Sequence, residues 1–167
     1  DGHPLYDYAQ PDRVQGELYF TYPPFAALLL RPFAAVPLGF TIGFFCVFTV
    51  AAVAVAAWWL TAPVADRRGL PRWLLAGLLF PVALAVEPTR ETYFFGQINM
   101  ILVLLILADF CHAIPRRWFW AGAGVGLATA IKLFPGIFIL YFLVTRRWRE
   151  AAVSAGTAVA ATLLAGA

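Results

Sequence analysis

Polar and charged side chains gather in one stretch of an otherwise apolar sequence. Residues 87–100 (EPTRETYFFGQINM) hold two carboxylates, one guanidinium and two amides, although only 13% of the chain is charged. The planar fork of Arg90 suits an anionic phosphate, and a carboxylate suits proton abstraction from a sugar hydroxyl. The amides of Gln97 and Asn99 enter an apolar helix, where they would otherwise meet lipid. We predict a polar pocket at a membrane surface, rather than an ordinary solvated loop with an Arg–Glu pair, lined by Glu87, Arg90, Glu91, Gln97 and Asn99.

Lys132 is a further candidate, because it is the single lysine among twelve cations. It follows an apolar helical stretch and stands beside Pro135, where freed backbone groups must be buried or face water. A cation within a membrane segment is a functional hypothesis by default, and the role we predict is to hold a phosphate linked to a lipid. The alternative is a lysine at a helix end whose ammonium group reaches the membrane interface.

Other polar residues give weaker signals. Asp109, Cys111 and His112 invite a metal site, but neighbouring residues of a helix point in different directions. We therefore expect a helix-end cluster without a metal, and we expect no cofactor. Cys46 and Cys111 lie in apolar runs and are expected to be buried small hydrophobes. The catalytic residue stays unknown, with Asp7 and Glu91 as weak candidates.

Composition and charge pattern indicate a membrane protein. Hydrophobic residues make up 62% of the 167 positions, more than the roughly half that is usual in soluble domains. Most cations fall in three clusters within short breaks between apolar runs, at positions 67–72, 116–117 and 146–149. This is the positive-inside pattern of membrane proteins, and it argues against nucleic acid as a partner, which favours cations on one soluble face.

The elements that must position these residues follow from the apolar runs. We expect an all-α polytopic membrane protein, a single helical bundle of about four to six transmembrane or half-membrane helices. Its segments are an outer loop (1–24), an interfacial helix (25–36), transmembrane helices (38–61, 73–86 and 98–113), a broken helix or hairpin (118–144) and a further helix (151–167). If the arginines on both sides of 118–144 are cytoplasmic, this segment is a hairpin; otherwise it is one kinked helix. The positive-inside rule favours the hairpin.

Four local patterns, in this order and spacing, resemble a known family. They are LYDY at 5–8, FTYPPF at 20–25, GQIN at 96–99 and GLATAIKLFP at 126–135. They are similar to the bacterial polyprenyl-phosphate-mannose-dependent α-mannosyltransferases of glycosyltransferase family 87, integral-membrane enzymes of the GT-C class found in mycobacteria and their relatives. The resemblance covers most of the chain. Tyr22 of the second pattern joins the candidate donor-binding residues.

The resemblance implies an activity and a location. The donor would be polyprenyl-phosphate-mannose, the acceptor a glycolipid of the phosphatidylinositol mannoside or lipomannan type, and the product an α-mannoside formed with inversion. The enzyme would be a multi-pass protein of the plasma (inner) membrane, active on the extracytoplasmic face and surrounded by membrane lipids. In the GT-C class the base is an acid in the first outer loop. We expect that acid upstream of residue 1, so that this piece alone is inactive.

Two other functions stay open at this point. A GT-C transferase for another sugar, such as arabinose or glucose, would share these patterns, because sugar choice depends on the shape of the pocket. A lipid or solute transporter would also use broken helices and charges within the membrane, as at Lys132.

Overall fold

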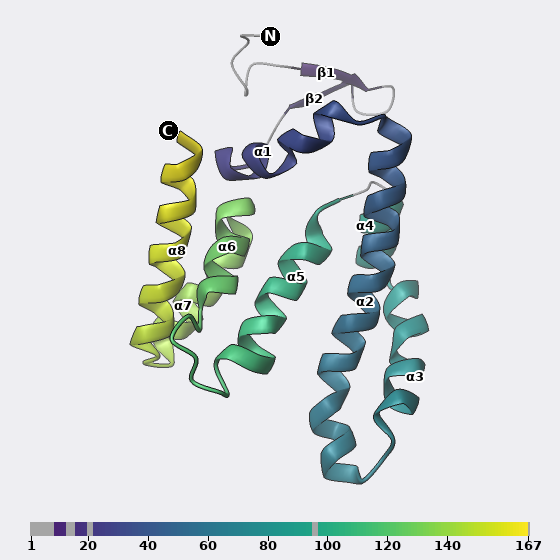
Figure 1. Cartoon of the computed structure of the whole chain (residues 1–167), viewed down its shortest axis with the longest axis vertical. Coiled ribbons are helices and arrows are strands. Elements are labelled where there is room, and N and C mark those ends of the chain that lie inside the picture. Colours follow the sequence, from purple (N-terminus) through teal and green to yellow (C-terminus); the bar gives the residue numbers. More distant parts are fainter. Residues whose placement is uncertain (1–8, 13–15, 20–21, 95–96, 167) are drawn as a thin grey trace.

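A computed structural model describes residues 9–12, 16–19, 22–94 and 97–166. The helices form one bundle, with a short β-hairpin drawn above it (Figure 1). In chain order the elements are β1 Ala9–Asp12, β2 Gly16–Tyr19, α1 Pro24–Leu30, the 3-10 helix η1 Arg31–Ala35, α2 Leu38–Arg68, α3 Arg72–Ala85, α4 Glu87–Phe94, α5 Asn99–Ala108, the π-helical turn η2 Asp109–Ala113, α6 Ala123–Ile131, the 3-10 turn η3 Phe134–Gly136, α7 Ile137–Val144 and α8 Trp148–Gly166.

A short β-hairpin lies within the range 1–24 that was expected to be an outer loop, and the other described elements are helical, as expected. Strands β1 and β2 pair antiparallel, with Ala9 opposite Tyr19 and Asp12 opposite Gly16. Two extended segments so close in sequence satisfy each other's backbone N–H and C=O groups at little cost in chain entropy. Asp7 lies outside the described residues.

The first helical segment lies across the upper end of the bundle (Figure 1). Pro24 opens α1 at a position where its missing N–H costs no helical bond, and the segment tightens to a 3-10 helix at Arg31 and Pro32. Ala26 is fully buried against α5 and α6 residues. This segment occupies the range expected for an interfacial helix; its place relative to a membrane stays a prediction.

Helix α2 is longer than the 38–61 span expected from the sequence. It continues through Pro63 to Arg68 and ends at Gly69, whose φ of 63° allows the Leu70 N–H to donate to the Ala65 carbonyl. This left-handed glycine cap is a common way to end a helix. Among the described helices, α2 alone is both long and apolar enough to cross a membrane; the other apolar helices, α3 among them, are shorter. Its outer face is apolar, with Leu38 and Val47 exposed by 74% and 71%.

The segment 118–144 turns back on itself. Helix α6 ends at Ile131, and α7 returns beside α8, so that the two ends of the segment come together. Arg149 Nη2, in the first turn of α8, donates to the carbonyl of Trp118, which precedes α6, over 2.9 Å. The arginines that flank this segment therefore lie at one end of the bundle, as the hairpin alternative requires. The turn between α2 and α3, which carries the remaining cluster, lies toward the same lower end in Figure 1.

Helix α6 is the centre of the bundle because glycines let its neighbours approach closely. A Cβ added at Gly124 would lie 2.2 Å from the Leu105 carbonyl oxygen, and one at Gly126 would lie 2.4 Å from the Ser154 carbonyl oxygen. Small residues at such contacts are typical of tightly packed membrane helices. Their close packing brings α5 and α8 against the two sides of α6.

The glycine contacts give a first prediction. We expect Gly124→Ala to destabilise the full-length protein by about 2 kcal/mol, because the backbone of α5 must move away. Gly43→Ala in α2 is the matched control: no atom lies within 4 Å of its added Cβ, so this variant should be as stable as the parent or slightly more stable. Thermal unfolding in detergent measures both. Equal stability of the two variants would contradict the close packing of α5 and α6.

Candidate functional site

Lys132 stands where α6 ends, and its ammonium group is held by residues of two other segments. Its backbone is extended, with φ of −149°, so the side chain leaves the helix direction. Lys132 Nζ donates to Asn99 Oδ1 over 3.2 Å and lies 5.5 Å from the centre of the Tyr22 ring. The side chain is half-buried. A cation is thus fixed between the start of α5 and the residue that precedes the Pro23–Pro24 pair.

Asn99 extends this contact into a chain of polar groups. Its Nδ2 donates to Gln97 Oε1 over 2.6 Å and to Thr92 Oγ1 over 3.3 Å. Thr92 is buried, and its hydroxyl donates to the Pro88 carbonyl over 2.8 Å. Because Asn99 uses Nδ2 for Gln97 and Thr92, its oxygen is directed at Lys132. We call Tyr22, Thr92, Gln97, Asn99 and Lys132 the polar chain.

The polar chain unites four residues that were candidates in the sequence analysis: Tyr22, Gln97, Asn99 and Lys132. They come from separate parts of the chain, up to 110 positions apart in the numbering. Thr92 is the member that sequence reasoning missed. Its one sequence signal was a place in the polar stretch one helical turn after Pro88, a spacing at which a threonine hydroxyl can donate to the carbonyl four residues earlier.

The acidic residues and Arg90 lie elsewhere. Glu87, Arg90 and Glu91 are exposed on α4, and none of their side chains has a hydrogen bond or ion pair with another residue in the described part of the chain. Helix α4 packs against α2 and α3. The predicted roles of these three side chains in substrate binding stay predictions.

An apolar cavity of about 640 Å³ opens beside Lys132 and Asn99. Its other walls are Leu102, Val103, Ile106 and Leu107 of α5, and Phe134, Pro135 and Phe138 of the returning hairpin. Two polar side chains, those of Lys132 and Asn99, therefore line a cavity whose other walls are apolar. We call it the α5–α7 cavity.

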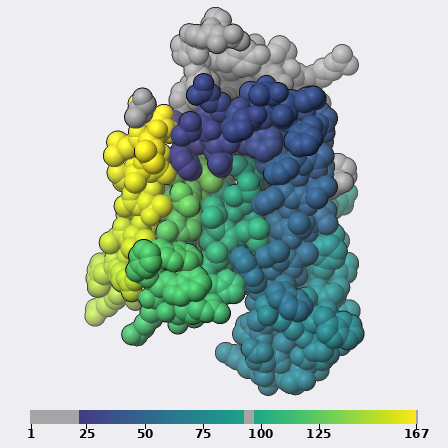
Figure 2. Space-filling model, viewed as in Figure 1, coloured from purple at the N-terminus to yellow at the C-terminus, as the bar shows by residue number. Residues whose placement is uncertain are grey.

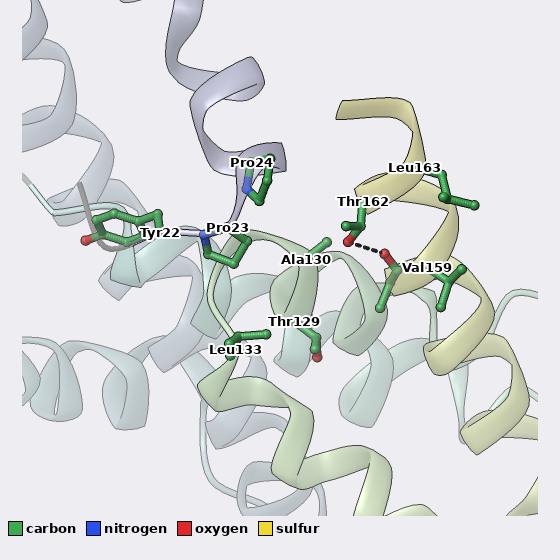
Figure 3. A pocket seen from close by; sticks show the side chains of 10 residues that line it. Tyr22, Pro23, Pro24, Thr129, Ala130, Leu133, Val159, Thr162 and Leu163 are labelled. Carbon is green, nitrogen blue, oxygen red and sulfur yellow. Dashed lines mark hydrogen bonds between the residues drawn. The ribbon is translucent and has the colours of Figure 1, made fainter. Parts of the chain in front are cut away.

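Two further cavities reach the polar chain from other sides. One of about 550 Å³ has walls from the start of α1, the end of α6 and α8, with Tyr22 and Pro23 at one side and Thr162 and Leu163 at the other (Figure 3). Another of about 370 Å³ includes both Tyr22 and Gln97. Its lining also includes Thr41, whose buried Oγ1 has no hydrogen-bond partner among the described residues. The polar chain therefore borders three cavities.

Asp109 is a second polar centre, at the opposite end of α5. Its side chain is fully buried; Oδ1 accepts from the Gly122 N–H over 3.0 Å, and Oδ2 accepts from the Val125 N–H over 2.8 Å. A carboxylate at the first turn of a helix satisfies N–H groups that have no partner within the helix. Asp109 thus fixes the beginning of α6 against the end of α5.

His112, near Asp109 in the sequence, makes other contacts. His112 Nδ1 lies 2.9 Å from Arg116 Nη1, and its ring packs edge-on against Trp59 with centroids 4.8 Å apart. No group of three potential metal-ligating side chains occurs among the residues that the structure describes.

Asp109 and Lys132 are linked through the two antiparallel helices. Asn99 precedes Asp109 by ten positions, and Gly122 precedes Lys132 by ten positions. At about 1.5 Å per residue, each of these two ten-residue stretches is roughly 15 Å long. The Asp109 contacts at one end therefore set the register that lets Lys132 reach Asn99 at the other.

The arrangement suits an amphiphile with an anionic head. Lysine has three N–H donors and a charge that a phosphate oxygen can approach, and one of these donors is engaged by Asn99. The apolar walls of the α5–α7 cavity suit a hydrocarbon tail and strengthen electrostatic contacts made by the two polar side chains that line it. The site can thus stabilise a lipid-linked phosphate, including one that leaves during a group transfer.

Comparison with known proteins shows the family of this chain. The model of glycosyltransferase family 87 matches residues 20–167. The chain therefore belongs to glycosyltransferase family 87. No solved structure matches it.

Characterised relatives give the comparison more detail. The polyprenol-phosphate-mannose-dependent alpha-(1-2)-phosphatidylinositol mannoside mannosyltransferase of Mycolicibacterium smegmatis is 37% identical over 98% of this chain and 39% of its own length. The corresponding pentamannoside mannosyltransferase of that organism is 37% identical over 90% of this chain and 36% of its own length. An alpha-(1->3)-arabinofuranosyltransferase of Corynebacterium glutamicum is 32% identical over 78% of this chain and 31% of its own length. The chain thus spans about two fifths or less of these relatives.

Proposed function

We propose that the full-length protein transfers mannose from polyprenyl-phosphate-mannose to a glycolipid acceptor of the phosphatidylinositol mannoside or lipomannan type. The family and the names of the two mycobacterial relatives support the donor and the acceptor class. The single observation that carries the proposal is the Lys132 ammonium, held 3.2 Å from Asn99 Oδ1 in the lining of an apolar cavity. Such a site fits a donor that joins a phosphate to a long hydrocarbon.

The donor would lie with its phosphate at Lys132 and the first isoprenoid units in the α5–α7 cavity. Asn99, itself bonded to Gln97, holds the ammonium in place, so that little reorganisation is needed when the phosphate leaves with its negative charge. The ring of Tyr22, at the junction of two cavities, would border the sugar. Glu87, Arg90 and Glu91 remain proposed contacts for the polar part of donor or acceptor.

The reaction would be one inverting displacement. An acceptor hydroxyl attacks the anomeric carbon, its proton passes to a carboxylate, and the C–O bond to the phosphate breaks. We propose that this carboxylate is the acid of the first outer loop of the family, with Asp7 and Glu91 as weaker candidates. The proposal uses no cofactor, because the lipid phosphate is already a leaving group.

The proposed location is the plasma membrane, with several helices crossing it. By the positive-inside rule the end with the three arginine clusters faces the cytoplasm. Lys132 and Asn99 lie at the other ends of α6 and α5, so the donor site would open to the extracytoplasmic side. Lipids of the membrane are then the direct surroundings of the outer helix faces.

Transfer of another sugar is the second candidate function. The Corynebacterium relative is named as an arabinofuranosyltransferase, and the phosphate site described above does not depend on the sugar. Presenting the full-length protein with labelled polyprenyl-phosphate-mannose and polyprenyl-phosphate-arabinose in turn separates the two. Label transfer from mannose alone is expected; transfer from arabinose alone would overturn the sugar assignment while keeping the phosphate site.

A bulky substitution in the α5–α7 cavity tests whether the hydrocarbon tail of the donor lies there. Val103→Trp should raise the KM for the donor about tenfold, because the indole occupies the space that the proposed tail needs. Val55→Trp on α2 is the matched control: both valines are 38% exposed, and Val55 lines none of the cavities described above. Steady-state kinetics of both full-length variants at saturating acceptor give the comparison. An unchanged donor KM in Val103→Trp would place the tail elsewhere.

A further inference from the structure

A separate polar cavity lies at the far end of the bundle from Lys132. It has a volume of about 730 Å³ and forms where the loop before α6 meets the loop before α8. In Figure 2 this region belongs to the green and yellow-green surface, and α2 and α3 project below it. Its charged lining consists of Arg117, Arg146, Arg147, Arg149 and Glu150. Four cations against one carboxylate make this cavity attractive to an anion.

The backbone at two of these arginines is unusual. Arg117 has φ of 53° and Arg146 has φ of 56°, the two positive values found for non-glycine residues in the described chain. In this region the Cβ atom crowds the backbone, so glycine is the usual occupant. Here both positions carry a long cationic side chain instead, and both side chains line one cavity. Departures from preferred geometry of this kind gather at binding sites.

Most of the guanidinium groups that line this cavity have N–H donors that no described residue engages. Arg149 Nη2 donates to the Trp118 carbonyl over 2.9 Å. The side chains of Arg117, Arg146 and Arg147 have no hydrogen bond or ion pair with any other described residue. Three cations held near one another repel unless an anion lies between them. A phosphate offers several acceptor oxygens, and the planar guanidinium group of arginine matches it well because it donates two hydrogen bonds at once.

The surroundings of the cavity favour a phosphate that carries hydrocarbon chains. Tyr141 and Trp148, both exposed, line the cavity, and such amphipathic rings are typical of the membrane interface. From this rim the apolar face of α7 continues outward, with Leu140 and Val144 exposed by 61% and 83%. Basic pockets between membrane helices on the cytoplasmic side are known to hold anionic lipid head groups.

We propose that this cavity binds the phosphate head group of an anionic membrane lipid, whose acyl chains lie along the exposed face of α7. The bound lipid would tie the loop before α6 to the loop before α8, and so hold both ends of the hairpin together. The site is distinct from the donor site and does not depend on the mannosyl-transfer activity, so the two proposals can fail separately.

Lipid retention by the full-length protein tests the proposal. The protein is purified in a neutral detergent, mixed with phosphatidylglycerol or with phosphatidylcholine, and examined by native mass spectrometry. We expect retention of phosphatidylglycerol and little of phosphatidylcholine. The double variant Arg117→Gly, Arg146→Gly should lose the two cations at positions whose backbone suits glycine, so that the fold persists. Its affinity for phosphatidylglycerol should fall about tenfold through the loss of two charge-assisted contacts.

A second double variant tests whether the lipid binds at this cavity or is attracted by positive charge anywhere on the protein. The variant Arg67→Gln, Arg68→Gln removes the same charge from the end of α2, which is away from the cavity, and should retain the lipid as the parent does. Equal retention by both variants, or equal loss in both, would overturn the proposal. Displacement of the lipid by millimolar inorganic phosphate would assign the cavity to free phosphate and overturn the lipid assignment.

Discussion

Replacing Lys132 by methionine is expected to lower kcat/KM for the lipid-phosphate donor about 100-fold in the full-length protein. The change keeps most of the side-chain volume and removes the one cation that is fixed by Asn99 at the α5–α7 cavity. Loss of a single preorganised group that stabilises developing negative charge costs about 10²–10³-fold in other enzymes. Steady-state kinetics with varied donor at saturating acceptor give the value.

Two controls accompany the Lys132 variant. Lys132→Arg keeps the positive charge with a different donor geometry and should retain part of the activity. Arg72→Met removes one cation from the opposite end of the bundle, where Arg72 donates to the Trp58 carbonyl over 2.8 Å, and should leave donor kinetics unchanged. Full activity in Lys132→Met, or an equal loss in Arg72→Met, would remove Lys132 from the donor site.

Replacing Asp109 by alanine should destabilise the protein by about 3 kcal/mol. Two buried backbone N–H groups at the start of α6 lose their acceptor, and each buried donor left without a partner costs about 1–3 kcal/mol. Because Asp109 also sets the register of α5 and α6, the variant should raise the donor KM as the Asn99–Lys132 contact loosens. Thermal unfolding in detergent and donor kinetics measure the two effects.

Two control variants accompany Asp109→Ala: one makes a conservative change at the same position, and the other lies far from it. Asp109→Asn keeps one carbonyl oxygen of the same size and should recover about half of the lost stability. Asp66→Ala removes an exposed carboxylate near the end of α2 and should change neither stability nor kinetics. If Asp109→Ala unfolds at the parent temperature, the buried carboxylate does not hold α6 in place.

Residue type alone was enough to nominate most of the polar chain. Gln97, Asn99 and Lys132 are polar side chains in apolar helical surroundings, where they would cost free energy without partners. That they are partners of one another was beyond the sequence, because Asn99 and Lys132 are 33 positions apart. Their contact depends on how far α6 slides along α5, which is decided by close packing at Gly124 and by the Asp109 cap.

Other features of the structure could not be predicted from the sequence, each for a different reason. The role of Asp109 was missed because its partners are backbone N–H groups, which have no side-chain signature, while Cys111 and His112 drew attention to a metal. Helix α2 extends beyond the expected 38–61 span because Pro63 does not end it, and the helix continues to its Gly69 cap. The β-hairpin was missed because its strands have four residues each, too short for an alternating pattern to stand out.

The most direct test is transfer of radiolabelled mannose by the full-length protein in membranes. Polyprenyl-phosphate-mannose is supplied with a phosphatidylinositol mannoside acceptor, and the labelled glycolipid is digested with an α-mannosidase to check the linkage. We predict label in the glycolipid, its release by the α-mannosidase, and a fall to near background in Lys132→Met at equal protein level. Absence of transfer by the parent protein, or undiminished transfer by Lys132→Met, would contradict a mannosyltransferase that holds its donor phosphate at Lys132.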